Sequence, residues 1–77
     1  MPNVSRYVTG TVQRIGQISQ DTFAVEFWVN GVGMETFYIN TRYFDNFATW
    51  LGYNPSDPNP MRRCTLSVAH NYIEGWQ

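Results

Sequence analysis

The stretch TFAVEFWVNGVGMETFYIN, residues 22–40, decides the fold because it reads as two β-strands joined at an Asn-Gly pair. Apolar side chains alternate along both halves, so a hairpin can gather them on one face. Gathering them requires Phe23 to lie opposite Ile39, which leaves residues 30–32 as the loop. A two-residue Asn-Gly turn would instead pair Phe23 with Tyr38 and mix the two faces. We therefore predict the longer loop.

The opposite face of this hairpin carries more apolar area than a face in water should. It includes Trp28, Met34 and Tyr38, whereas the solvated side of an antiparallel sheet is normally polar. Two interpretations are open for these side chains. They either complete the core of a chain that is short of core residues, or they form a contact surface for another protein.

The chain before the hairpin predicts another strand. Apolar and polar residues alternate from Val4 to Gln13, and the apolar face changes between Arg14 and Gly16. One extra residue in a strand produces such a change, so we expect a β-bulge or a strand end near these residues.

A helix is predicted directly after the hairpin. Thr41 is expected to be its N-cap, and Gly52 its left-handed C-cap. Laid out at helical spacing, the apolar residues form one continuous arc. The middle of the arc consists of Phe44, Phe47 and Leu51, and its edge of Tyr43 and Trp50.

The C-terminal third predicts a connector and a strand. Prolines at positions 55, 58 and 60 favour an extended connector. Residues 62–72 alternate regularly and predict a single strand. One face of that strand would carry Cys64, Leu66, Val68, His70 and Tyr72. Residues 73–77 are expected to form a short fifth strand or a docked chain end.

The predicted fold class is α+β, with residues 1–77 forming a single domain. A small, mostly antiparallel sheet in the order β-β-β-α-β, with a short fifth strand as an option, would be covered by one amphipathic helix. A helix between the third and fourth strands resembles the topology of oligonucleotide-binding (OB) barrels. A partly open OB-like barrel is therefore an alternative, although a truncated last strand counts against closure.

The residue inventory argues against an enzyme. One cysteine and one histidine form neither an internal disulfide nor a four-ligand zinc site, and no cofactor or metal is expected. On one strand, Cys64 and His70 would lie about 20 Å apart, beyond the contact that a nucleophile and its base require. No apolar run reaches membrane length and no signal sequence is recognisable, so we expect a cytoplasmic protein without a membrane partner.

The composition favours a role in protein recognition. Aromatic residues make up 17% of the chain, and every basic residue is an arginine, which is the pattern that protein interfaces enrich. We predict a small non-enzymatic interaction module, acting on another protein or as a homodimer. A viral or mobile-element accessory protein that inhibits a partner by covering its surface would fit. The candidate contact residues are Trp28, Met34, Tyr38, Tyr43, Trp50 and Tyr53.

The alternative is an OB-like protein that binds single-stranded nucleic acid. Exposed aromatic rings on a sheet could stack on bases. The candidate phosphate contacts are Arg6, Arg14, Arg62 and Arg63. A net charge of −1 supports this alternative only weakly, because phosphate neutralisation supplies much of the affinity for nucleic acid.

Overall fold

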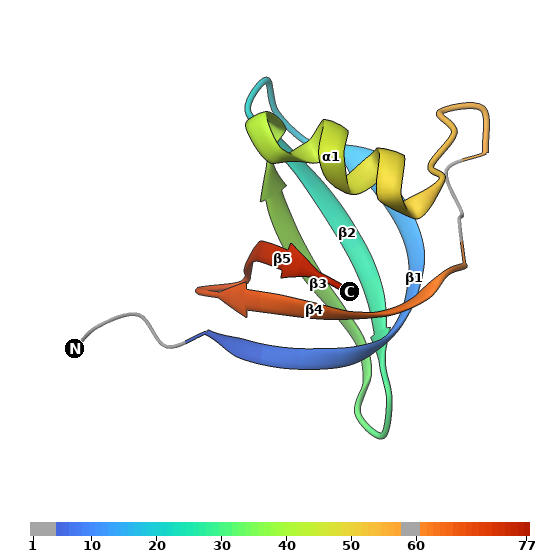
Figure 1. The fold of residues 1–77 in the computed structure, drawn as a ribbon, viewed down its shortest axis with the longest axis vertical. Coiled ribbons are helices and arrows are strands. Elements are labelled where there is room, and N and C mark those ends of the chain that lie inside the picture. The colour runs from blue at the N-terminus through green and yellow to red at the C-terminus, as the bar shows by residue number, and fades with distance from the viewer. Residues whose placement is uncertain (1–4, 58–60) are drawn as a thin grey trace.

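A computed structural model describes residues 5–57 and 61–77 of the chain. These residues fold into a five-stranded β-barrel with one helix (Figure 1). Its elements are β1 (Arg6–Gln17), β2 (Thr22–Val29), β3 (Gly33–Asn40), α1 (Thr41–Leu51), β4 (Arg63–Ala69) and β5 (Tyr72–Trp76). The strands close in the order β1-β2-β3-β5-β4. In Figure 1, α1 lies across one end of the barrel, and the tip of the β2–β3 hairpin projects from the other.

The α+β class is confirmed, and the closed barrel is consistent with the OB-like alternative. Three features differ from the prediction. The barrel is closed and not partly open, although the last strand is short. The barrel closes through a parallel pairing of β3 with β5, at Tyr38 and Tyr72, so the sheet is mixed. In addition, the single strand expected over residues 62–72 is wrong, because it is divided into β4 and β5.

A tight turn causes this division. His70 and Asn71 have φ angles of 52° and 66°, which is the left-handed pair that a two-residue type I′ hairpin turn requires. The chain therefore reverses, and β5 pairs antiparallel with β4. His70 and Tyr72 consequently do not share the buried face of β4. Asparagine tolerates this backbone region better than most residues, so Asn71 was the available sequence signal.

The hairpin register is confirmed over its whole length, from Thr22 opposite Asn40 to Val29 opposite Gly33. The loop occupies residues 30–32, as expected. The Val32 amide donates to the Val29 carbonyl oxygen at 3.0 Å, which closes a β-turn over residues 29–32. Gly31 is the third residue of this turn and has a positive φ of 79°, which glycine adopts readily.

Strand β1 belongs to both halves of the barrel. Its first part, residues 6–11, pairs with β4, and residues 10–17 pair with β2. The register shifts between Val12 and Arg14, which confirms the predicted bulge slightly earlier in the chain than expected. At Gly10, where the two pairings overlap, a Cβ atom would lie only 1.8 Å from the carbonyl oxygen of Trp28. The absence of a side chain lets β1 curl closely over β2 at this point.

Helix α1 begins one residue earlier than predicted, since its N-cap is Asn40 and not Thr41. The extended end of β3 leaves Asn40 in a β conformation, from which its side-chain oxygen accepts the Arg42 amide at 3.0 Å. The C-cap at Gly52 is confirmed, as is the burial of Phe44, Phe47 and Leu51. With 11 residues, α1 is the one helix among the described residues, none of which forms a helix long and apolar enough to cross a membrane.

The core fills the barrel and the space beneath α1. Phe27, Phe37 and Phe47 are completely buried. Trp76 at the end of β5 packs edge-on against Phe47, with ring centroids 5.1 Å apart. The C-terminal segment therefore helps α1 to close its end of the barrel.

The connector after α1 starts with a turn and is not extended there, contrary to the prediction. Asn54 accepts the Asp57 amide through its carbonyl oxygen and the Ser56 amide through its side chain, at 2.8 and 2.9 Å. Pro55 lies inside this turn, where its fixed φ is favourable. Pro58 and Pro60 lie outside the described residues.

Candidate functional site

The outer surface of the sheet carries a transverse row of four side chains. Trp28 on β2 lies opposite Met34 on β3 and, on its other side, opposite Thr11 on β1. Thr11 in turn pairs with Arg63 on β4. We call Arg63, Thr11, Trp28 and Met34 the outer row. The row crosses β4, β1, β2 and β3, and the pairing of β1 with β4 adds Arg63, which is distant in sequence, to the other three residues.

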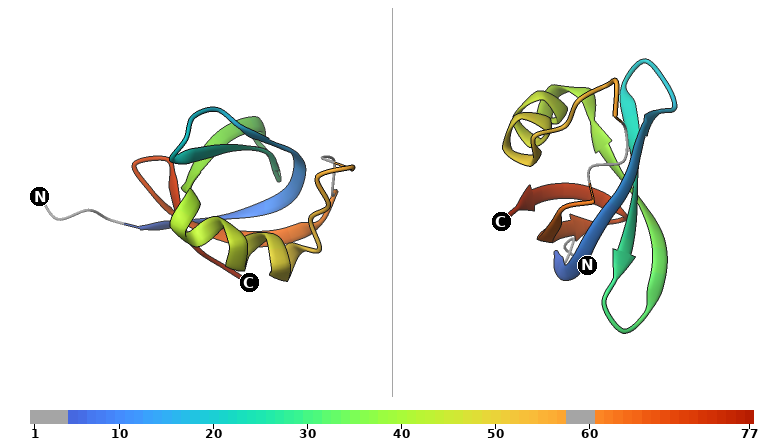
Figure 2. Two further views of the ribbon diagram at one scale, coloured as in Figure 1. Left: turned by 90° about the horizontal axis from the view of Figure 1, so that it is seen from above. Right: turned by 90° about the vertical axis from the view of Figure 1, so that its right-hand side faces the viewer.

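Alternation along the strands explains why this row faces outward. Phe27 and Val29 point into the barrel and are buried, so Trp28 between them points away from it. Trp28 and Met34 are each 48% exposed, and Val32 at the hairpin tip is 72% exposed. We call Trp28, Val32 and Met34 the hairpin patch. It lies at the end of the β2–β3 hairpin whose tip projects beyond the barrel in the right-hand view of Figure 2.

A second aromatic group lies further along the same surface. Tyr38 lies opposite Ala24 and contacts the ring of Tyr72, with centroids 5.7 Å apart. The pairs between this group and the outer row are polar, with Glu26 opposite both Arg14 and Thr36. The predicted contact residue Tyr38 therefore shares the surface with Trp28, but it belongs to a separate cluster at the β3–β5 closure. Tyr72 was missed because residues 62–72 were read as one strand.

The other candidate contact residues lie around α1. Tyr43 is exposed, and the Arg42 guanidinium lies 5.8 Å from its ring centroid. Trp50 is partly buried against the core, where Arg62 covers its ring at 4.0 Å and donates a hydrogen bond to its carbonyl oxygen. The structure thus separates Tyr43 and Trp50 from the hairpin patch by the length of the barrel (Figure 1).

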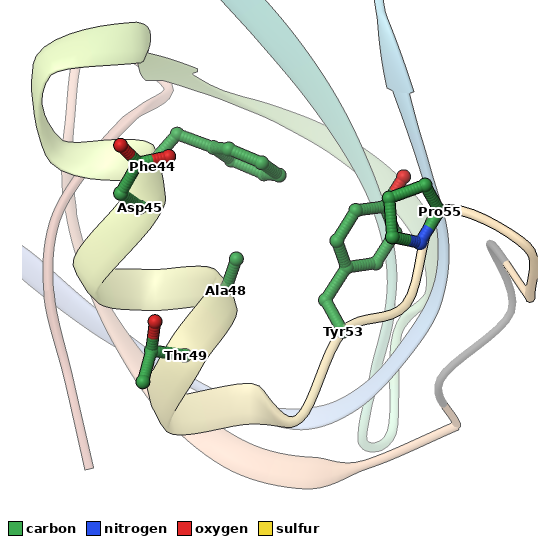
Figure 3. A pocket seen from close by; sticks show the side chains of 6 residues that line it. All are labelled: Phe44, Asp45, Ala48, Thr49, Tyr53 and Pro55. Atoms are coloured by element: carbon green, nitrogen blue, oxygen red, sulfur yellow. The ribbon is translucent and has the colours of Figure 1, made fainter.

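A hollow of about 290 Å³ lies between α1 and the turn that follows it. Figure 3 shows Phe44 and Ala48 on α1 at one side of this hollow and the ring of Tyr53, from the segment after the helix, at the other. Its remaining lining residues are Asp45, Thr49 and Pro55. Tyr53 is partly buried here and meets Phe44 edge-on at 5.6 Å, so this predicted contact residue is also a packing residue of the helix.

A second hollow, of about 370 Å³, lies beside β5. It is lined by Asn40, Tyr43, Tyr72, Ile73 and Glu74. The Glu74 carboxylate accepts a hydrogen bond from the Ser5 hydroxyl at 2.6 Å. Each hollow contains a single carboxylate, and neither lining pairs a nucleophile with a base.

The four candidate arginines do not form one patch. Arg6 contacts Glu35 at 3.5 Å and lies over the Phe37 ring, so it covers the barrel end. Arg62 covers Trp50, as described above. Arg14 and Arg63 are exposed on the same outer surface as Trp28. Arg63 is the end of the outer row, and Arg14 lies next to the row, opposite Glu26.

Cys64 and His70, the residues best suited to nucleophilic or acid–base chemistry, lie apart from these surfaces. Cys64 points into the barrel, and burial raises the pKa of its thiol to about 11. A thiol with that pKa is protonated at neutral pH and is a poor nucleophile. His70 lies in the β4–β5 turn. Within residues 5–57 and 61–77, no three side chains of the metal-binding types come together.

Comparison with known proteins adds no relative: no family model matches the chain, and no curated protein or solved structure matches it either.

Proposed function

We propose that this protein is a non-enzymatic interaction module that binds a protein partner through the hairpin patch and the outer row. One observation carries the proposal. The barrel completely buries Phe27, Phe37 and Phe47, yet it leaves Trp28 and Met34 side by side and half exposed on a projecting hairpin. Large apolar side chains that a small core does not use are the usual anchors of protein interfaces.

The composition of the outer row supports a protein partner. Tryptophan, methionine and arginine are the residues that interfaces enrich, and the row contains one of each beside a threonine. Arg63 lies at the end of the row, where a polar rim would surround an apolar centre. The proposal includes the predicted accessory or inhibitory role, in which occupying a partner's surface is the whole activity.

Site-specific photo-crosslinking tests the proposal. A benzophenone amino acid replaces Met34 in one variant and Thr49, on the exposed side of α1, in a matched control. In cells of the organism that makes the protein, we expect a discrete crosslinked product from position 34 and none from position 49. Adding Trp28→Ala should abolish the product while the circular dichroism spectrum stays native, because Trp28 is not part of the core. A product from position 49 alone would reject this face.

A self-crosslinked dimer from position 34 would identify the partner as a second copy of the chain. Sedimentation velocity at micromolar concentrations checks this outcome, since a dimer held by the patch should dissociate in the Trp28→Ala variant. Tyr43→Ala provides a control, because it removes an exposed ring from the opposite end of the barrel.

Single-stranded nucleic acid is a second candidate ligand. The observation in its favour is that a barrel consistent with the OB type carries Trp28, Arg14 and Arg63 on one outer surface, with both arginines on the side of β2 that faces β1. A fluorescent oligothymidylate should then bind with an affinity that falls steeply with salt, and Arg14→Ala with Arg63→Ala should flatten that dependence. Arg62→Ala is the control, since Arg62 is engaged with Trp50. Absence of binding at low salt would eliminate this candidate.

A further inference from the structure

The barrel is closed at one position only between β3 and β5. Their ladder consists of the pair Tyr38 and Tyr72, where the Tyr38 amide donates to the Asn71 carbonyl oxygen at 2.8 Å. Residues 33–37 lie before this pair, on the part of β3 that leads up from the hairpin tip. In the part of the chain that the structure describes, no strand pairs with residues 33–37 on the side away from β2.

The bond made by Tyr38 fixes the direction of the neighbouring backbone groups. Successive residues of a strand direct their N–H and C=O groups to opposite sides, so Thr36 and Met34 share the outward direction of Tyr38. Glu35 and Phe37 direct theirs toward β2, where they pair with Phe27 and Val25. The open edge thus offers two donors and two acceptors, at Met34 and Thr36.

We propose that an extended segment of a partner protein adds to this edge as an antiparallel strand, with a basic residue opposite Glu35 and apolar residues on either side of it. This inference rests on the proposed protein-binding function and specifies how the partner is held. Strand addition fits the site because backbone bonds would hold the segment while its alternate side chains reach a neighbouring surface. That surface is the hairpin patch, which begins at Met34 itself.

Charge determines the residue at the centre of the segment. Glu35 lies between the two outward-directed residues, and its carboxylate contacts the exposed guanidinium of Arg6 at 3.5 Å. Opposite charges directly across a ladder are favourable and like charges are unfavourable. A lysine or arginine opposite Glu35 therefore fits, and the residues opposite Met34 and Thr36 would lie on the patch side, where apolar or β-branched side chains pack.

The same geometry disfavours a second copy as the added strand. Two identical β3 edges can form four backbone bonds only by pairing Met34 with Thr36 of the other copy. That register places the two Glu35 residues directly opposite each other. The neighbouring registers need either Tyr38, whose amide is bonded to Asn71, or Val32, whose amide is bonded to Val29. A foreign segment has none of these conflicts.

Amide exchange of the free protein gives the first test. The Met34 and Thr36 amides should exchange quickly, whereas those of Glu35 and Phe37, bonded to β2, should be protected. Protection of Thr36 in dilute protein would mean that the edge is already covered and would overturn the proposal. Protection that appears only as the protein concentration rises would identify a second copy, which would overturn it too.

A synthetic peptide gives the second test. The probe is the capped heptapeptide TTVRVTT, titrated to millimolar concentration and followed by the amide resonances of Met34 and Thr36. We expect these two amides to shift, and the matched peptide TTVEVTT to bind at least about threefold more weakly. Methylating the two valine nitrogens should abolish binding, whereas methylating the arginine nitrogen should not. No shift of either amide, or equal binding of all peptides, would refute strand addition.

Two variants separate this proposal from the proposed function. Thr36→Pro removes one outward N–H at a position where an edge strand tolerates proline, and Thr36→Val keeps that N–H. We expect Thr36→Pro to weaken the binding of TTVRVTT about tenfold and Thr36→Val to leave its affinity unchanged. If the partner crosslinked from position 34 is lost with Trp28→Ala but kept with Thr36→Pro, the patch binds it without strand addition. If Thr36→Pro does not fold, the N-methylated peptides decide.

Discussion

Replacing Gly10 with alanine should destabilise the barrel more than the addition of a single methyl group would suggest. The added Cβ would lie 1.8 Å from the Trp28 carbonyl oxygen and 2.8 Å from its carbonyl carbon. Real Cβ atoms essentially never come closer than 3.0 Å to another atom, so moving from 1.8 to 3.0 Å requires a shift of at least 1.2 Å. The atoms that must move are backbone atoms, which cannot rotate away as a side chain can.

The expected loss of stability follows from this displacement. Overpacking a tight site costs about 1–3 kcal/mol and occasionally more. Gly10 is at the upper end, because β1 would have to separate from β2 where it also pairs with β4. Alanine restricts the unfolded chain and offsets only about 0.4–1 kcal/mol of this cost. We expect a net loss of about 2–3 kcal/mol, which for a domain of this size lowers Tm by roughly 8–24 °C.

Thermal and urea unfolding, followed by circular dichroism, measure this effect. Gly16→Ala is the matched control, because a Cβ added at Gly16 on the same strand would meet no atom within 4 Å and the residue has no positive φ. That variant should be neutral or slightly stabilised. If Gly10→Ala and Gly16→Ala differ by less than about 1 kcal/mol, the close approach of β1 to β2 is not the constraint argued above.

Three further outcomes test other parts of the structure. Asn40→Ala should cost about 1 kcal/mol in unfolding experiments while Thr41→Ala costs clearly less, and the reverse order would restore Thr41 as the N-cap. Arg62→Ala should lower the unfolding free energy by about 0.5–1 kcal/mol through loss of its contact with Trp50, with Arg63→Ala unchanged as the control. Burial raises the pKa of the Cys64 thiol to about 11, so Ellman's reagent at pH 8 should label the native protein far more slowly than the unfolded chain. Rapid labelling of the native protein would contradict the burial of Cys64. Because the folded protein keeps this thiol protonated, the thiol contributes stability that is fully present below the unfolded pKa near 9 and is lost as the pH rises toward 11. The Cys64→Ala variant should not show this loss of stability.

Local patterns were sufficient for much of the fold. The hairpin register could be predicted because a shift of one residue moves every side chain of a strand to the other face, and only one register buried Phe27 with Phe37. The helix and its C-cap could be predicted because Gly52 and the apolar arc are local signals. The division of residues 62–72 was missed because alternation continues through a two-residue turn as if the strand were straight.

The candidate site shows the same limit. Alternation placed Trp28 and Met34 on one surface, but it could not say whether another segment covered them. Likewise, nothing near Arg62 in the sequence indicates Trp50, and nothing near Arg63 indicates Thr11. Trp50 and Arg62 are separated by the connector after α1, and Thr11 and Arg63 by two strands and the helix, so only the tertiary fold brings each pair together.

For the β2–β3 hairpin and α1, the sequence by itself determined which residues turn inward, because that choice depends on the short periods of strand and helix. It also determined the chemistry that the chain can supply: one thiol, one histidine, five arginines and a surplus of apolar residues. Tertiary structure alone decided which strands are neighbours and where the sheet stays open. Strand neighbours are selected by contacts between distant residues, here the parallel meeting of Tyr38 with Tyr72, and such contacts leave no periodic trace in the chain. That one contact closes the barrel, and the length of β3 below it is the edge on which we expect a partner to bind.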